Sequence, residues 1–379
     1  MRKQGNTPFS RRSFLATPAA AAAAVAGAPA VLGAQSPNGT IHVAFVGVGN
    51  RGSYLLRHML KVPGIKAVAV ADLIPDRTAK AAAAIAGAGG KAATYTDYRK
   101  MIEEQKAIDA VVVAIPDYKH KDAYITVLES GKHLYAEKPL ALTRRDCQEI
   151  VDAANRAKGI MQVGFQLRFD PNRHAAEQFI HGGGIGRVLF CHGMRHGHDI
   201  PHRLKWYFDR TKDGDIMMDQ GIHILDLFTW AIGSHPIRAM GSGGIDLLMD
   251  DPPGRTIMDN YSVLFDYEGA RVNFSHNYFD PPGFSGDQER VFGSKGAVDL
   301  KAATWQPRDK RGPQIKLEVP NAGANSTYLS LAAFIENVRL KRKPPINNVE
   351  SAMQSTLVPL MGTRAIYEKR IVTWEETAG

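Results

Sequence analysis

Short apolar runs alternate with segments of helical spacing along the first half of the chain. The run 110–115 contains only Ala, Val and Ile and is bounded by Asp109 and Pro116. A run of this kind, with no polar alternation, is typical of a strand buried on both faces of a parallel sheet. The repeated pattern therefore predicts strand–helix–strand units wound on both sides of one sheet. The predicted strands are 41–46, 67–71, 110–115, 133–136 and 159–165, and the predicted helices include 77–86, 98–104, 119–130 and 144–157.

Beyond residue 165 the predicted strands follow one another more directly. The runs 261–267 and 270–276 flank Glu268-Gly269, a dipeptide suited to a hairpin turn. We therefore predict an α/β protein with an N-terminal Rossmann domain and a C-terminal α/β domain built on an open, mainly antiparallel sheet. Further strands are predicted at 188–192 and 297–300, and helices at 171–181, 217–232, 328–340 and 349–367.

The length and charge of the chain limit its organisation and its partners. A chain of 379 residues is long enough for two hydrophobic cores. The formal charge is +9, but four basic residues lie in the first 34 positions, which hold no acid. The sequence has no basic run with interleaved aromatic residues, so nucleic acid is not an expected partner.

The first 34 residues have the pattern of an export signal. Ser10-Arg11-Arg12-Ser13-Phe14-Leu15 precedes an Ala-rich, mildly apolar stretch, and the whole resembles a twin-arginine signal peptide. The resemblance implies export of the folded protein by the twin-arginine translocase to the periplasm or another extracytoplasmic space. The alternatives are a disordered Ala-rich tail and a weak membrane anchor, although the stretch is short for a span. Two cysteines, Cys147 and Cys191, imply no disulfide framework.

A glycine-rich turn follows the first predicted strand. Gly47, Gly49 and Gly52 have the spacing GxGxxG and open a helical segment. Such a turn aims backbone N–H groups at a pyrophosphate, and the helix dipole favours the anion. Asp72 ends the second strand, where a carboxylate accepts hydrogen bonds from a ribose diol and repels a 2′-phosphate. This favours NAD over NADP, with Arg77 left as a residue that would accommodate the phosphate.

Glu137-Lys138-Pro139 ends another predicted strand of the same sheet. Ligands of Rossmann folds bind at this edge, so the Lys138 ammonium would reach both the nicotinamide ribose and a substrate hydroxyl. Pro139 would make the turn rigid, in a trans or a cis form. The alternative is a solvated Glu–Lys pair in a loop.

Asp219 and His223 are four residues apart in a predicted helix, so they share one face, with Asp226 near it. A His beside a carboxylate can accept a hydroxyl proton while hydride leaves the carbon. The alternative is an amphipathic helix whose apolar residues build the core.

Three motifs together resemble the glucose–fructose oxidoreductase, inositol dehydrogenase and MocA family: the glycine turn, Glu137-Lys138-Pro139 and Asp219-xxx-His223. The resemblance implies action on sugars or cyclitols, with Lys138 contacting substrate and cofactor, Asp219 binding substrate and His223 as the acid/base. It also implies that Arg168 faces the substrate, and that subunits pair through the open sheet as a homodimer or homotetramer. The family's glycine triplet is Asp213-Gly214-Asp215 here. The residues assigned to the cofactor are Gly47, Gly49, Asn50, Arg51, Gly52, Asp72, Pro116, His120, Glu137 and Lys138.

The segment 195–202 is rich in His and Asp, which are common metal ligands. It lacks a thiolate and a second ligand pair at helical spacing. We therefore expect a polar loop over the pocket mouth and no metal.

These observations predict an exported NAD(P)-dependent oxidoreductase that transfers hydride between nicotinamide and a sugar, polyol or glycoside. Because a dissociable cofactor is not replenished outside the cytoplasm, we expect it to stay tightly bound. One alternative is an NAD-dependent glycosidase that oxidises, eliminates and re-reduces its substrate, and another is an inactive sugar-binding protein. The predicted parts are the leader 1–34, the Rossmann domain 35–165, the substrate-binding domain 166–348, and a C-terminal helix within 349–379 that returns toward the first domain.

Overall fold

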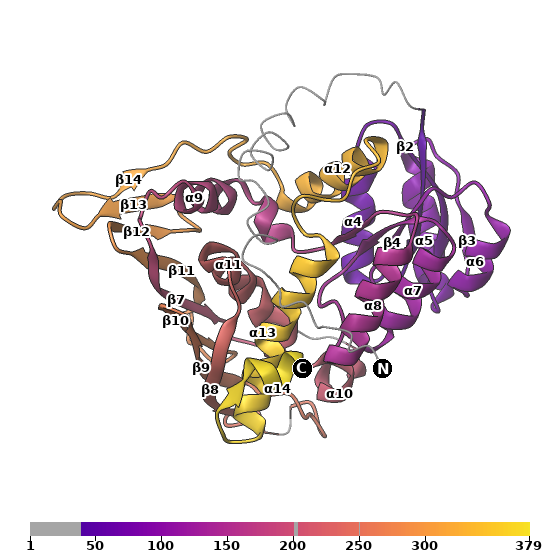
Figure 1. Cartoon of the computed structure of the whole chain (residues 1–379). Coiled ribbons are helices and arrows are strands. Elements are labelled where there is room, and N and C mark those ends of the chain that lie inside the picture. The colour runs from indigo at the N-terminus through magenta and orange to yellow at the C-terminus, as the bar shows by residue number, and fades with distance from the viewer. Residues whose placement is uncertain (1–38, 201–203, 250) are drawn as a thin grey trace, which may run out of the picture.

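The computed structural model describes residues 39–200, 204–249 and 251–379. The predicted signal peptide, residues 1–34, lies outside these ranges. Figure 1 shows two units side by side, each built around its own sheet. The expected fold class is confirmed, with a parallel Rossmann sheet in the first unit and a mostly antiparallel sheet in the second.

The first unit has a six-stranded parallel sheet in the order β3-β2-β1-β4-β5-β6. Its inner strands are apolar and buried on both faces, as the continuous apolar runs predicted. The strands are β1 (Ile41–Val46), β2 (Ile65–Ala71), β3 (Ala93–Tyr95), β4 (Ala110–Val113), β5 (His133–Ala136) and β6 (Met161–Val163). The helices are α4 (Asn50–Met59), α5 (Pro75–Gly87), α6 (Tyr98–Glu104), α7 (His120–Glu129) and α8 (Arg144–Arg156).

The second unit has a nine-stranded sheet in which only β7 and β10 pair in parallel. Its order is β14-β13-β12-β11-β7-β10-β9-β8-β15. Side chains alternate along β9 and β10, so one face packs against helices and the other remains open. The strands are β7 (Val188–His196), β8 (Pro236–Gly244), β9 (Asn260–Tyr267), β10 (Ala270–Asn277), β11 (Gly286–Gly293), β12 (Gly296–Asp299), β13 (Thr304–Pro307), β14 (Ile315–Lys316) and β15 (Val372–Thr373).

Most of the helices that follow the first sheet begin at a side-chain cap. Asp170 caps the helix α9 by accepting a hydrogen bond from the Arg173 N–H, and Pro171 occupies its first turn. A π-helical turn, Met217–Gly221, leads directly into α11 (Ile222–Ile232), where one continuous helix over 217–232 was expected. The remaining helices are α9 (Pro171–His181), α10 (Arg210–Asp213), α12 (Ser326–Arg339), α13 (Val349–Tyr367) and α14 (Trp374–Ala378).

Two late helices tie the units together. Leu331, Phe334 and Ile335 of α12 lie in the core of the first unit, although α12 falls within the range 166–348. α13 runs between the two sheets in Figure 1 and supplies Leu357 to the first core and Met361 to the second. Within the ranges that the structure describes, no helix combines the length and the hydropathy that crossing a bilayer requires.

Candidate active site

The glycine turn joins β1 to α4 at the carboxyl edge of the first sheet. Gly47 has a φ of +79°, and a Cβ there would overlap the carbonyl oxygen of Ala114. A Cβ at Gly52 would overlap the carbonyl oxygen of Gly47, so helix and turn approach as closely as glycine permits. Gly49 occupies the N-cap of α4 and has no side chain between the helix N-terminus and a ligand. The turn therefore forms a cradle for a pyrophosphate, next to Asn50 in the first helical position.

Asp72 is fixed beside this cradle. Its Oδ2 accepts a hydrogen bond from the Val48 N–H at 2.9 Å, and its Oδ1 accepts one from the Ile74 N–H at 3.0 Å. Arg77 lies over Gly49 and places Nη1 3.9 Å from Asp72 Oδ1. One carboxylate and one guanidinium thus occupy the position at which a ribose diol or a 2′-phosphate would bind.

Arg51 points from α4 toward the end of β5. Its Nε donates to Glu137 Oε1 at 2.7 Å, while its Nη2 is buried and has no hydrogen-bond partner among the described residues. A buried donor without a partner costs free energy, about 1–3 kcal/mol, unless a ligand satisfies it. The glycine cradle, the helix N-terminus and this orphaned donor together fit a dinucleotide phosphate.

His120 is fully buried and holds two loops at the same edge. Its Nδ1 lies 2.7 Å from the Pro139 carbonyl oxygen and its Nε2 lies 3.0 Å from that of Ile115. Burial lowers the pKa of His120 to about 4. With no exposed surface, His120 positions the Pro116 loop and the turn after Lys138, so its predicted cofactor role is indirect.

Lys138 reaches across from the first unit to the second. Its Nζ donates to Asp219 Oδ1 and to the Asp219 carbonyl oxygen, both at 2.6 Å. Both side chains are nine-tenths buried, and Lys138–Pro139 is a cis peptide. The structure thus brings together two residues that the sequence placed in separate motifs, 81 positions apart.

His223 lies one π-helical turn from this pair, on the first turn of α11. π-helical turns are rare and concentrate at functional sites. Burial lowers the pKa of His223 well below its ordinary value, and the charges of Lys138 and Arg195 lower it further. Its Nδ1 is buried without a hydrogen-bond partner among the described residues. The imidazole is therefore neutral at pH 7 and able to accept a proton.

Two site residues were not assigned from the sequence. Gln220 donates to Asp219 Oδ2 at 2.6 Å and accepts a hydrogen bond from Arg195 Nη2 at 2.9 Å. Arg195 lies on the inner face of β7, on the same side as Cys191 and Gly193. Strand alternation extended beyond 192 would have placed Arg195 on this face, whereas the expected strand ended at 192.

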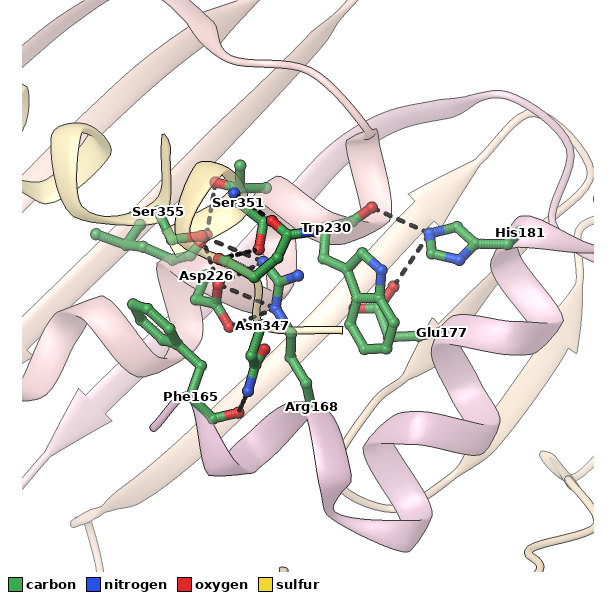
Figure 2. Close-up of polar contacts among 12 residues, drawn as sticks. Phe165, Arg168, Glu177, His181, Asp226, Trp230, Asn347, Ser351 and Ser355 are labelled. Atoms are coloured by element: carbon green, nitrogen blue, oxygen red, sulfur yellow. Dashed lines mark hydrogen bonds and ion pairs between the residues drawn. The ribbon is translucent and has the colours of Figure 1, made fainter. Parts of the chain in front are cut away.

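Arg168 was expected to face the substrate but is buried in an interdomain cluster, which Figure 2 shows. Its Nε and Nη2 donate to the carboxylate of Asp226 at 2.6–3.1 Å, and Nη2 also donates to Ser355 Oγ at 3.2 Å. Its guanidinium lies 5.1 Å from the centroid of the Trp230 ring. Arg168 therefore joins α11 and α13 through its hydrogen bonds to Asp226 and Ser355. It is not positioned to contact the substrate, as was expected.

The segment that replaces the family's glycine triplet places two acids behind the site. Asp213 is fully buried, and burial together with the nearby Asp219 carboxylate raises its pKa well above the ordinary value. Burial raises the pKa of Asp215 to about 6, although Tyr367 donates a hydrogen bond to it. Among the residues that the structure describes, no group of three or more His, Cys, Asp and Glu side chains is arranged to hold a metal ion.

Two family models match most of the described chain. A model described as an oxidoreductase family with an NAD-binding Rossmann fold, GFO_IDH_MocA, matches residues 41–165. A model of the GFO/IDH/MocA C-terminal domain matches residues 174–299. The first therefore contains the glycine turn, Asp72 and Lys138, and the second contains Asp219 and His223.

Known proteins with related sequences or folds include enzymes of sugars and cyclitols. Inositol 2-dehydrogenase 2 of Saccharopolyspora erythraea is 31% identical over 202 residues, which are 53% of this chain and 56% of that protein. The 2,7-anhydro-N-acetylneuraminate hydratase of Mediterraneibacter gnavus is 31% identical over 206 residues, 54% of this chain and 53% of that protein. The chain thus spans about half the length of these relatives. A levoglucosan dehydrogenase in complex with NADH has the same fold, with a TM-score of 0.76, 19% identity and coverage of 88% of this chain and 99% of that one.

Proposed function

Because this chain belongs to the GFO/IDH/MocA oxidoreductase family, we propose that it transfers hydride between NAD(P) and a hydroxyl-bearing carbon of a sugar, polyol or glycoside. The observation that carries the proposal is the meeting of Lys138, Asp219 and His223 at the edge where the dinucleotide cradle lies. NAD is the expected cofactor and NADP the alternative, given the adjacent Asp72 and Arg77.

Each of the three residues has a distinct part in this reaction. The neutral His223 accepts the proton of the substrate hydroxyl, and the Lys138 ammonium stabilises the oxygen as negative charge develops on it. Asp219 holds the Lys138 ammonium and accepts a hydrogen bond from a neighbouring substrate hydroxyl. Bound NAD supplies the hydride acceptor.

Replacing His223 with Ala tests the proposal. General-base catalysis contributes about 10²–10⁴-fold, so H223A should lose at least a hundredfold in kcat when nicotinamide absorbance is followed over a panel of inositols, aldoses and anhydrosugars. NADH titration by fluorescence should show unchanged binding, because the cradle lies on the first unit. H42A, at the start of β1, is the matched control. Turnover by H223A at the wild-type rate would overturn the assignment.

A redox-neutral outcome is the second candidate. It is favoured by the hydratase among the relatives, whose name describes no net oxidation. The same residues would oxidise a glycoside transiently, assist elimination of its substituent and return the hydride. Product analysis separates the two: hydrolysis of a p-nitrophenyl glycoside without an added hydride acceptor supports the glycosidase, and accumulation of NADH supports the dehydrogenase.

We further propose that the protein is exported folded, with its dinucleotide bound. The support is the twin-arginine pattern at Arg11 and Arg12. Cell fractionation of the full chain should place it outside the cytoplasm, and replacing both arginines with Lys should retain it inside. Denaturing the purified exported protein should release a nicotinamide dinucleotide identifiable by mass. Light scattering tests the proposed homodimer or homotetramer.

A further inference from the structure

Arg195 has more exposed surface than the ion pair at the centre of the proposed hydride-transfer site. Its side chain is 30% exposed, whereas those of Lys138 and Asp219 are each 10% exposed. Arg195 lies on the inner face of β7, which faces the π-helical turn, and not on the open face through which subunits are expected to pair. Its guanidinium is therefore available to a ligand that binds at this turn.

Arg195 and Lys138 bind two consecutive residues of the π-helical turn. Lys138 Nζ donates to Asp219 Oδ1 at 2.6 Å, and Arg195 Nη2 donates to Oε1 of the next residue, Gln220, at 2.9 Å. The Gln220 amide in turn donates from Nε2 to Asp219 Oδ2 at 2.6 Å. The two cations thus occupy the two ends of one chain of three hydrogen bonds. A ligand of the size of a monosaccharide, bound over this turn, would contact both of them.

The positive charge of Arg195 is only loosely balanced by the protein. Asp287, which is opposite Arg195 in the β7–β11 pairing, places Oδ1 3.7 Å from Arg195 Nη1, beyond hydrogen-bond distance. The other carboxylate oxygen of Asp287 lies 3.6 Å from Lys301 Nζ, so two cations share one acid. Among the described residues, only Gln220 accepts a hydrogen bond from the Arg195 guanidinium, which has five N–H donors. Arg195 therefore has both charge and donors left for an anionic group.

The two histidines beside Arg195 are neutral and do not compete with it for an anion. His276 is aligned with Arg195 in the pairing of β7 and β10 and is 2% exposed. Burial lowers the pKa of His276 to about 3, and the charge of Arg195 contributes to this shift. The pKa of His223 is lowered for the same reasons, together with the charge of Lys138. An anion at Arg195 thus lies beside a cation and buried, uncharged rings, where an ion pair is stronger than in water.

We propose that the substrate is an acidic sugar whose carboxylate binds Arg195, an inference that rests on the proposed hydride transfer. Its class is the uronic acids, the aldonic acids and their glycosides. The planar guanidinium offers a carboxylate two parallel N–H groups, and such a charged pair is stronger than hydrogen bonds between neutral groups. The rest of the sugar extends over Gln220 and Asp219, and the hydroxyl-bearing carbon that is oxidised lies beside Lys138 and His223. A neutral sugar satisfies only the second of these two ends.

Matched pairs of neutral and acidic sugars test the proposal: glucose with glucuronate, galactose with galacturonate, and sorbitol with gluconate. Nicotinamide absorbance gives kcat/KM, and calorimetry measures binding to the complex of the protein with NADH. In at least one pair the acid should be favoured about 10–100-fold, as expected for hydrogen bonds to a charged group. R195Q should remove this preference, and R195K, which keeps the charge but loses the paired donors, should retain part of it. R145Q, on the exposed face of α8, is the control and should keep it.

Binding and turnover separate this proposal from that of hydride transfer. Acids that bind more tightly than their neutral partners, with the advantage lost in R195Q, support the carboxylate site even where no NADH forms, a result that counts against the oxidoreductase instead. Equal affinity within every pair, a preference that R195Q retains, or failure of every acid to bind would overturn the carboxylate site. Turnover of the neutral sugars in that case would leave the proposed hydride transfer standing.

Discussion

His223 lies beside Lys138 and Arg195, and its placement sets the pH range in which it can take a proton. Burial and these charges lower its pKa, so the neutral base persists below the ordinary value of 6.5. Activity that needs the neutral imidazole is lost only as the pH falls through this lowered value. The acid limb of kcat/KM therefore belongs below pH 6.5.

Replacing Arg195 with Gln should move this limb upward. Removal of a nearby positive charge raises the His223 pKa, by up to about one pH unit. The measurement is the pH profile of kcat/KM for both proteins. R271Q, on the open face of the same sheet, should leave the limb where the wild type has it. An unchanged limb in R195Q would show that the guanidinium charge does not act on His223.

Asp72 gives a second prediction at this scale. D72A removes the acceptor for the ribose diol and the repulsion of a 2′-phosphate, with Arg77 still in place. We expect NAD to bind roughly tenfold more weakly, the loss of about one hydrogen bond to a charged group, and NADP to bind more tightly. Fluorescence titration with both reduced dinucleotides measures this. NADP binding to D72A no better than to wild type contradicts the role.

The sequence placed Lys138, Asp219 and His223 in motifs, and the structure brings them together, but their roles stay predictions. The sequence did not show which of these side chains contact other side chains in the folded protein. Arg168 lies at the start of the predicted second domain, yet its partner Asp226 is 58 residues away. The sequence positions of Arg168 and Asp226 do not show that the Arg168 guanidinium is already paired with the Asp226 carboxylate. The role of Gln220 likewise becomes visible only in the structure, where Arg195 on β7 donates a hydrogen bond to it.

At the scale of elements, strong apolar periodicity predicted the Rossmann strands and the hairpin, and the structure contains them. β8 and β11 were not predicted. β8 ends in Gly241-Ser242-Gly243-Gly244, and β11 carries Asp, Gln, Glu and Arg, so neither has the apolar alternation of a half-buried strand. Both are held by pairing with neighbours, a tertiary effect that a single segment does not reveal.

The cluster in Figure 2 yields a prediction for the elements that it joins. D226A leaves the Arg168 guanidinium buried without its carboxylate, and breaking a buried ion pair in this way costs about 3–5 kcal/mol. S355A removes two hydrogen bonds, the one that Ser355 Oγ donates to Asp226 and the one that it accepts from Arg168, and should cost about 1–3 kcal/mol. Urea unfolding monitored by circular dichroism measures both. Equal, small losses would show that the pair adds little to the junction between α11 and α13.

At the scale of the whole molecule, α13 contributes to two cores at once. Leu357 is buried in the first and Met361 in the second, so neither unit is complete without this helix. We therefore expect the two units to unfold together rather than one after the other.

Leu357→Ala tests this coupling. The cavity should cost about 2–5 kcal/mol in the first core. All four tryptophans pack against the second core and only Trp374 also packs against the first, so fluorescence reports mainly the second unit, whereas NADH binding reports the first. In L357A both signals should shift to the same lower urea midpoint. A fluorescence midpoint that stays at the wild-type value would mean that the units unfold separately.

The ion pair between Lys138 and Asp219 also bears on how such proteins diversify. In the proposed reaction, one partner comes from the domain that holds the dinucleotide and the other from the domain that meets the substrate. A gene fusion that exchanged the second domain would keep hydride chemistry only if the incoming segment offered an acid at the same place. The ion pair thus limits which second domains are compatible with a given cofactor domain. Chimeras that preserve the pair are those in which a new substrate preference can arise on an unchanged cofactor domain.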